Sequence, residues 1–261
     1  MSHFKAAFFD VDDTLYDHFK HEYPADGIEA IREMARRGIK VFLCSARPYG
    51  SQKDFKCFDL GIEWSGFIAS SGGVAVVGDK VVHKEYMKKR DVYALVKKAK
   101  SLGLTAELVT TYDRYMIAPP NEYSERYHAI YKDETNVVRD YRGENSSGLL
   151  LFAPKEYDEE MLSAAPGAIG FRFEEYGIEF MGSMHSKGKA IEDVLNYLGI
   201  DKEDAISFGD NLQDIPMADA TGCFVCMGNG RDEVKAAADY VTDSVSDNGL
   251  ANAIHKLILG D

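Results

Sequence analysis

Residues 4–15 read FKAAFFDVDDTL, an apolar run that ends in a group of aspartates. The run is short, rich in phenylalanine and bounded by charge, which indicates a buried β-strand. Asp10 and Asp12 leave the carboxyl end of that strand, where open α/β sheets bind their ligands. Side chains two residues apart in extended backbone face the same side, so we expect the two carboxylates to converge.

The sequence around this stretch alternates apolar runs with helical patterns. After the first strand we predict helices over 24–37 and 49–60, and strands over 39–44 and 66–70. The same alternation returns over 187–259. This order favours βαβ units, and therefore an α/β fold with a Rossmann-like core, a parallel sheet covered by helices on both faces.

Residues 82–183 have a different pattern. A predicted helix over 90–101 is followed by a tyrosine-rich helical stretch and by predicted strands over 105–111, 114–120, 148–153, 170–176 and 178–182. Strands joined by short turns favour an antiparallel sheet, here with helices on one face. We therefore predict a core domain formed by 1–81 and 184–261, with an inserted α+β domain over 82–183.

Composition limits the partners of the chain. Its 261 residues are 45% hydrophobic, which is enough for a large core. The formal charge of −13 opposes binding to nucleic acids and to anionic membranes. No leader peptide and no apolar run near the ~20 residues of a membrane span are present, so we expect a cytoplasmic protein. Composition leaves open whether the protein is a monomer or a homodimer.

The cysteines suit a reducing compartment. Four cysteines are too few for a disulfide scaffold in a chain of this length. Cys223 and Cys226 have CxxC spacing, but they lie in a predicted strand, where residues three apart face opposite sides. This arrangement favours structural thiols over a redox or zinc site.

The paired carboxylates suit phosphoryl transfer. Two close carboxylates do not both ionise unless a cation offsets their charge, and otherwise one keeps its proton. Asp10 would attack phosphorus, while Asp12 would protonate the leaving group and then activate water. Asp13 and Thr14 either cap the following turn or take a direct part.

A carboxylate that attacks a phosphate also needs positive charge nearby. Asp210 follows another predicted strand, and Asp214 lies one turn into the next helix, so both could reach one cation. Hard oxygen ligands without histidine or thiol indicate Mg²⁺.

Two further segments suit phosphate binding. Lys187 begins a predicted helix, where the helix dipole disfavours a cation unless an anion such as phosphate compensates it. A solvated surface lysine is the alternative. Ser45 ends a strand of the same predicted sheet, so its hydroxyl and the following backbone N–H groups could face that phosphate.

Taken together, FFDVDDTL, VFLCSARP, HSKGKAI and FGDNLQDIPM, in this order, resemble the haloacid dehalogenase-like superfamily, particularly its Cof-type sugar-phosphatase branch. The resemblance covers nearly the whole chain. It implies that Asp10 is the nucleophile and Asp12 the general acid and base. It also implies that Mg²⁺ is held by the Asp10 side chain, the Asp12 backbone carbonyl and Asp210, with Asp214 a direct or indirect partner.

The remaining expected contacts also come from the resemblance. The phosphate-binding residues that it implies are Ser45, Ala46, Lys187 and Gln213. In this branch a cap domain is inserted between the second and third motifs, and residues 82–183 take that place. The cap would select the substrate, with candidates at Tyr112, Arg114, Tyr123 and His128.

Three positions depart from the pattern of the branch. Ala46 stands where glycine is usual, and Ser71 and Gln213 stand where asparagine is common. The last two are expected near the phosphate or the substrate, so they leave the reaction type intact but weaken any analogy about the substrate.

The leading prediction is Mg²⁺-dependent hydrolysis of phosphate monoesters of small metabolites, such as sugar phosphates, through an aspartyl-phosphate. Phosphomutase-type transfer is an alternative, but mutases resemble a branch with a smaller helical cap. A dehalogenase would not need Asp12. A non-catalytic ligand-binding module is the third alternative, although such a module should have lost at least one of the predicted site residues.

Overall fold

The structure is a computed structural model that describes residues 3–110, 113–131 and 137–260. The chain divides into two compact units. Met1–Arg47, Lys56–Lys84 and Ser186–Asp261 form the first unit, and Pro48–Phe55 and Glu85–His185 form the second. The long segment of the second unit runs over Glu85–His185, and Pro48–Phe55 joins it from the part of the chain expected in the core domain. The predicted domain boundaries at 81/82 and 183/184 stay predictions.

The first unit contains an eight-stranded sheet with the order β13-β12-β11-β1-β2-β3-β4-β5. Its strands are β1 (Ala6–Phe9), β2 (Lys40–Cys44), β3 (Gly66–Ala69), β4 (Val74–Val77), β5 (Lys80–Lys84), β11 (Ala205–Gly209), β12 (Cys223–Cys226) and β13 (Tyr240–Val241). Pairing is parallel from β13 to β3, and β4 and β5 add an antiparallel edge.

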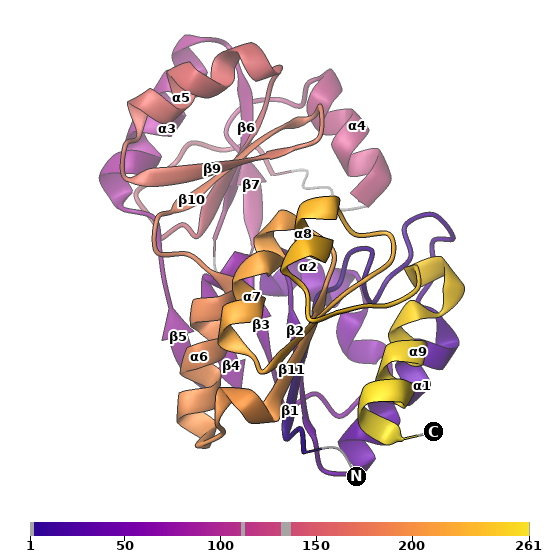
Figure 1. Cartoon of the computed structure of the whole chain (residues 1–261). Coiled ribbons are helices and arrows are strands. Elements are labelled where there is room, and N and C mark those ends of the chain that lie inside the picture. The colour runs from indigo at the N-terminus through magenta and orange to yellow at the C-terminus, as the bar shows by residue number, and fades with distance from the viewer. Residues whose placement is uncertain (1–2, 111–112, 132–136, 261) are drawn as a thin grey trace. The chain divides into compact units, whose positions relative to one another are not determined.

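Helices cover both faces of this sheet (Figure 1). They are α1 (Ala25–Arg36), α6 (Lys187–Leu198), α7 (Ile215–Ala220), α8 (Asp232–Ala237) and α9 (Gly249–Ile254), the last continued by a π-helical turn over His255–Leu259. Phe8 and Phe42 stack within the apolar layer beneath α6, α7 and α8. Helices α1 and α9 lie together on the opposite face. The predicted α/β class and parallel core are confirmed.

The second unit is built on a five-stranded antiparallel sheet with the order β7-β6-β8-β10-β9. Its strands are β6 (Thr105–Val109), β7 (Arg114–Met116), β8 (Gly148–Phe152), β9 (Ala168–Phe173) and β10 (Gly177–Gly182), and its helices are α2 (Tyr49–Asp54), α3 (Lys89–Ser101), α4 (Glu122–Tyr131) and α5 (Asp158–Ala164). The predicted antiparallel sheet is confirmed.

The prediction that the helices of this unit lie on one face of the sheet is wrong. Helices α3 and α5 pack against one face through residues such as Leu95 and Met161. Tyr123 and Tyr127 of α4 pack against the apolar cluster around Phe152, which belongs to the other face. The tyrosines of α4 give it enough apolar surface to cover this second face.

Local backbone geometry explains the other differences. The helix predicted over 49–60 ends at Asp54, because Lys56 adopts a left-handed conformation with φ 57°. The β4–β5 hairpin was not predicted, although Gly78, with φ +60°, and Asp79 make the short turn that joins its strands. Short 3₁₀ turns occupy Cys57–Asp59, Ser70–Gly72, Lys155–Tyr157, Lys202–Asp204, Leu212–Asp214 and Val245–Asp247.

Among the described residues, no helix has the length and apolar character that crossing a membrane requires. The predicted cytoplasmic location stays a prediction.

Candidate active site

The candidate site lies at the carboxyl ends of neighbouring parallel strands in the first unit. Asp10 follows β1 and Asp210 follows β11, and these strands pair with Phe9 opposite Phe208. The backbone N–H of Asp10 donates to the Phe208 carbonyl oxygen at 3.0 Å. Because the two strands end at the same level, their next side chains reach the same point.

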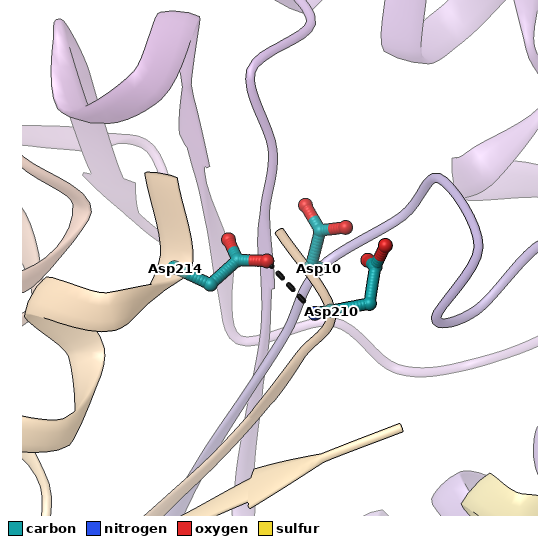
Figure 2. A group of neighbouring side chains, drawn as sticks. All are labelled: Asp10, Asp210 and Asp214. Carbon is teal, nitrogen blue, oxygen red and sulfur yellow. Dashed lines mark hydrogen bonds between the residues drawn. The ribbon is translucent and has the colours of Figure 1, made fainter. Parts of the chain in front are cut away.

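Asp10, Asp210 and Asp214 form a buried acidic cluster (Figure 2). One carboxylate oxygen from each residue lies within 4.8 Å of those from the other two. Oδ2 of Asp214 accepts the backbone N–H groups of Asp210 and Asn211, each at 3.0 Å. A Cβ atom at Gly209 would lie 2.6 Å from Asp214, so only glycine lets that carboxylate approach the end of the strand.

Lys187 places a buried ammonium group among these carboxylates. It begins α6 and is 2% exposed. Its Nζ lies 2.6 Å from Oδ1 of Asp10 and 2.5 Å from Oδ1 of Asp214. A lysine at the start of a helix needs an anion beside it. Here the carboxylates of Asp10 and Asp214 take that place. Burial alone would lower the Lys187 pKa, but attraction to Asp10 and Asp214 raises it well above its ordinary value.

The cluster nevertheless contains three carboxyl groups for one ammonium group. Burial raises the pKa of the Asp10 carboxyl to about 8, and repulsion from Asp214 and Asp12 adds to this effect against the attraction of Lys187. Burial and the same kind of repulsion also raise the pKa of Asp210 well above its ordinary value. A cation at this position would favour the ionised forms of both groups.

The residues present fit such a cation. Oδ2 of Asp10 and Oδ2 of Asp210 accept no hydrogen bond from the described residues, so both oxygens are available as ligands. The Thr14 hydroxyl donates to Oδ1 of Asp210 at 3.0 Å and fixes that carboxylate. Sequence alone left the role of Thr14 open, and the structure gives it this supporting contact. Carboxylate oxygens without nitrogen or sulfur match a hard divalent cation.

Asp12 is held separately from the cluster. Arg47, which is 5% exposed, donates from Nη2 to Oδ1 at 2.6 Å and from Nε to Oδ2 at 3.0 Å. Nε2 of His18 donates to the same Oδ1 at 2.6 Å. Burial raises the pKa of Asp12, but attraction to Arg47 and the hydrogen bonds from His18 and Arg47 outweigh it and lower the pKa well below its ordinary value.

The loop after β2 is tied to the turn after β3. The Ser45 hydroxyl accepts the backbone N–H of Arg47 at 3.1 Å, and Ala46 between them is partly exposed. The backbone N–H of Ser71 donates to the Ser45 carbonyl oxygen at 3.1 Å. The Ser71 hydroxyl donates to Oε1 of Gln213 at 2.8 Å. Two of the three positions that depart from the family pattern are thus in direct contact with each other.

Sequence reasoning missed two contacts of this site. Arg47 belongs to the motif VFLCSARP, but no role for it was predicted from the sequence. A basic residue two positions after Ser45 could have indicated a contact with one of the site carboxylates. His18 had no such signal, because only the folded loop brings it to Asp12.

The predicted substrate-selecting residues of the second unit have other partners. Arg114 and His128 are both buried and both contact the buried Glu107, at 3.1 and 3.0 Å. Tyr123 packs against an apolar cluster. Tyr112 lies outside the described residues. These contacts give the first three residues structural roles within their own unit.

Comparison with known proteins decides the family. The profile of the haloacid dehalogenase-like hydrolases matches residues 7–254. The chain belongs to this family. Among curated proteins, it is 31% identical to YkrA of Bacillus subtilis, which is provisionally named as a phosphatase, over 97% of both chains. It is 27% identical to phosphoglycolate phosphatase 1 of Saccharolobus solfataricus, over 98% of this chain and 97% of that protein.

Solved structures match nearly the whole length of the chain. A subclass IIB sugar phosphatase of the haloacid dehalogenase superfamily matches with a TM-score of 0.86 and 25% identity, over 97% of this chain and 98% of that one. A hypothetical protein from Geobacillus kaustophilus matches with a TM-score of 0.88 and 28% identity, over 98% of this chain and 99% of that one. The predicted family and Cof-type branch are confirmed, and the relatives support the predicted enzyme class, a phosphatase.

Proposed function

We propose that this hydrolase is a magnesium-dependent phosphatase that cleaves phosphate monoesters of small metabolites through an aspartyl-phosphate on Asp10. The observation that carries the proposal is the placement of Lys187 against Asp10, beside Asp210 and Asp214, at the carboxyl ends of β1 and β11. The Asp10 carboxylate thus has the ammonium group of Lys187 beside one oxygen, and its other oxygen is available to bind a metal ion.

In the first half-reaction, an Asp10 oxygen attacks phosphorus while Lys187 neutralises part of the charge on the phosphate and on Asp10. The Ser45 hydroxyl and the backbone that follows it would bind the phosphate oxygens, with Ala46 in that loop and Gln213 facing it. As the bond from phosphorus to the leaving oxygen breaks, Asp12 supplies a proton to that oxygen, and for this it must enter the step protonated, against the contacts that lower its pKa.

In the second half-reaction, water attacks the aspartyl-phosphate and Asp12 takes the proton of that water. The bond between phosphorus and Asp10 breaks, its electron pair returns to the carboxylate, and phosphate leaves. The hydrogen bonds from Arg47 and His18 suit the carboxylate form of Asp12 that this step requires.

The metal would be Mg²⁺, held by the Asp10 side chain, the Asp12 backbone carbonyl and Asp210. Asp214 already accepts Lys187 on one oxygen and two backbone N–H groups on the other, so we assign it the role of holding Lys187 and the Asp210 backbone. When bound, the cation supplies positive charge that brings the phosphate dianion and the nucleophile together.

The substrate class that we propose is a small phosphorylated metabolite, such as a sugar phosphate. Relatives named as a phosphoglycolate phosphatase and as a sugar phosphatase support a small phosphate ester. The net charge of −13 opposes polyanionic substrates such as nucleic acids. We propose that the second unit contributes substrate selection, as the cap of this branch is expected to do.

The test is a phosphate-release screen across sugar phosphates, phosphoglycolate and nucleotides, with Mg²⁺ and with EDTA. We expect release from at least one small ester in Mg²⁺ and loss of release in EDTA. Asp10→Asn should abolish it, while Asp243→Asn, an exposed position, should leave it unchanged. Folded wild-type protein that releases no phosphate from the whole panel would contradict the proposal.

A further inference from the structure

The carboxylate of Asp12 receives hydrogen bonds from two different segments of the first unit. Arg47 reaches it from the loop after β2, and His18 reaches it from the loop that follows β1. Oδ1 accepts Nη2 of Arg47 and Nε2 of His18, each at 2.6 Å. Oδ2 accepts only Nε of Arg47, at 3.0 Å, among the described residues. The Asp12 side chain is 25% exposed, so this carboxylate is open to solvent and to a reacting group.

The loop that carries His18 is fixed by its own hydrogen bonds. Buried Asp17 accepts the backbone N–H groups of Phe19 and Lys20 on Oδ1, at 2.8 and 2.9 Å, and the Ser246 hydroxyl on Oδ2 at 2.5 Å. The backbone of Asp17 also pairs with that of Glu22.

The ring of His18 is held as well. It packs edge-on against Tyr16, with ring centroids 5.0 Å apart, and its side chain is 9% exposed. Its backbone N–H donates to Oδ1 of Asp13 at 3.2 Å. His18 thus presents Nε2 to Asp12 from a rigid support, which is what a residue needs in order to orient a reacting group.

We propose that His18 is a positioning residue that, together with Arg47, holds Asp12 with Oδ2 directed to the hydrolytic water of the second half-reaction. The inference rests on the proposed function. Arg47 binds both oxygens of the carboxylate and fixes its rotation, and His18 holds Oδ1 from a second segment of the chain. Without His18, the carboxylate is held by one side chain among the described residues, Arg47, and it can shift together with that flexible side chain.

In the step concerned, the water oxygen forms a bond to phosphorus and one water proton moves to Oδ2 of Asp12. The bond from phosphorus to the Asp10 oxygen breaks, and its electron pair returns to that carboxylate. A shift of the Asp12 carboxylate slows this step, because proton transfer needs the water oxygen and Oδ2 of Asp12 within hydrogen-bond distance. Formation of the aspartyl-phosphate from an ester with a good leaving group does not need a proton from Asp12, so that step should be spared.

The test uses 4-nitrophenyl phosphate and His18→Phe, a variant that retains a ring against Tyr16. For this ester kcat/KM reports formation of the aspartyl-phosphate, and kcat reports its hydrolysis when hydrolysis is the slower step, which accumulation of phosphorylated enzyme demonstrates. We expect kcat to fall about 10-fold or more, with kcat/KM within about twofold of wild type and KM lower in proportion. Phosphorylated enzyme should accumulate in the steady state, as measured by acid quench and intact mass.

His18→Gln is the second variant, because its amide nitrogen can take the place of Nε2, and it should recover part of kcat. The matched control is His83→Phe. His83 is another largely buried histidine bonded to an aspartate, with Nδ1 2.7 Å from Oδ2 of Asp193 on α6, and its replacement should not lower kcat selectively.

Wild-type kcat in folded His18→Phe would overturn the inference, and so would an equal fall of kcat and kcat/KM in both His18 variants. A wild-type enzyme that never forms phosphorylated protein would instead overturn the proposed function, and the inference with it.

Discussion

The ammonium nitrogen of Lys187 lies 2.6 Å from Oδ1 of Asp10, and both side chains are buried. An isolated carboxylate at this depth would keep its proton. Lys187 therefore supports the charged form that a nucleophile needs, and it does so from the first residue of α6, whose helix dipole opposes a cation there. This unfavourable placement indicates a functional reason for the lysine.

Replacing Lys187 by methionine should damage both activity and stability. The change leaves Asp10 and Asp214 facing each other without their shared cation. We expect phosphate release to fall by at least about 100-fold, and the free energy of unfolding in EDTA to fall by roughly 3 kcal/mol at neutral pH. Urea unfolding and phosphate release measure the two effects.

Lys189→Met is the control for this change. Lys189 lies two residues further along the same helix, is exposed and pairs with Glu192 at 3.0 Å. The Lys189→Met substitution should change the free energy of unfolding by less than about 1 kcal/mol. Near wild-type turnover in Lys187→Met would remove the lysine from the site.

Thr14→Val should weaken metal binding without changing the chemistry at saturation. The Thr14 hydroxyl orients the Asp210 carboxylate, and loss of such a support commonly weakens metal binding by about 10–100-fold. We expect the Mg²⁺ concentration for half-maximal activity to rise by that factor, with kcat at saturating Mg²⁺ within a fewfold of wild type.

Thr221→Val removes a comparable buried hydroxyl contact, the one to Ser207 at 2.8 Å, and should leave the Mg²⁺ dependence unchanged. An unaltered Mg²⁺ titration in Thr14→Val would show that Asp210 does not ligate the activating metal.

The raised pKa of Asp10 predicts how stability without metal depends on pH. The carboxyl titrates near about 3.9 in the unfolded chain and at about 8 in the folded one. Between these values the folded state binds the proton and the unfolded state does not, so this group lowers the free energy of unfolding as pH rises. The slope is at most about 1.4 kcal/mol per pH unit.

Urea unfolding in EDTA at pH 5 and pH 8 measures this contribution. Wild type should lose more stability over this range than Asp10→Asn, which has no proton to release. Added Mg²⁺ should stabilise wild type more at pH 8 than at pH 5. Identical pH dependence of the two proteins would contradict the raised pKa.

The Ser71–Gln213 pair predicts coupled effects on substrate binding. The Ser71 hydroxyl holds Oε1 of Gln213, so Ser71→Ala and Gln213→Ala should each disturb the same orientation. We expect each single substitution to raise KM. The double substitution should raise KM by less than the product of the two single fold-changes. The coupling energy should be about 0.5–1.5 kcal/mol. Independent effects would show that the two side chains act separately.

Much of the site could be predicted because each residue stands directly after a predicted strand or at the start of a predicted helix. Asp10, Ser45 and Asp210 all follow apolar runs, and a parallel sheet brings such positions to one edge. The order of the strands was not needed for this conclusion. The mainly apolar runs at 6–9 and 205–209 were sufficient to predict the two strands, and both strands are fully buried.

Contacts made by loops could not be predicted in the same way. Arg47 is 35 residues from Asp12, and Gln213 is 142 residues from Ser71. The turn at Ser70 and Ser71 places both residues at φ 53°, a conformation that serine rarely adopts and that local sequence does not indicate. His18 depends on a loop fixed by Asp17 and Ser246, which lie 229 residues apart.

The account depends most on Asp10 as the nucleophile, and chemical trapping tests this directly. Wild-type enzyme turning over 4-nitrophenyl phosphate with Mg²⁺ is quenched and treated with borohydride, which reduces an aspartyl-phosphate to homoserine. Peptide mass spectrometry should find homoserine at position 10 with substrate and Mg²⁺ together, and not with either omitted or in Asp10→Asn. The account would be contradicted if the wild type released phosphate but gave no homoserine at position 10, and if His18→Phe, in which the phosphorylated enzyme should accumulate, also gave no homoserine there.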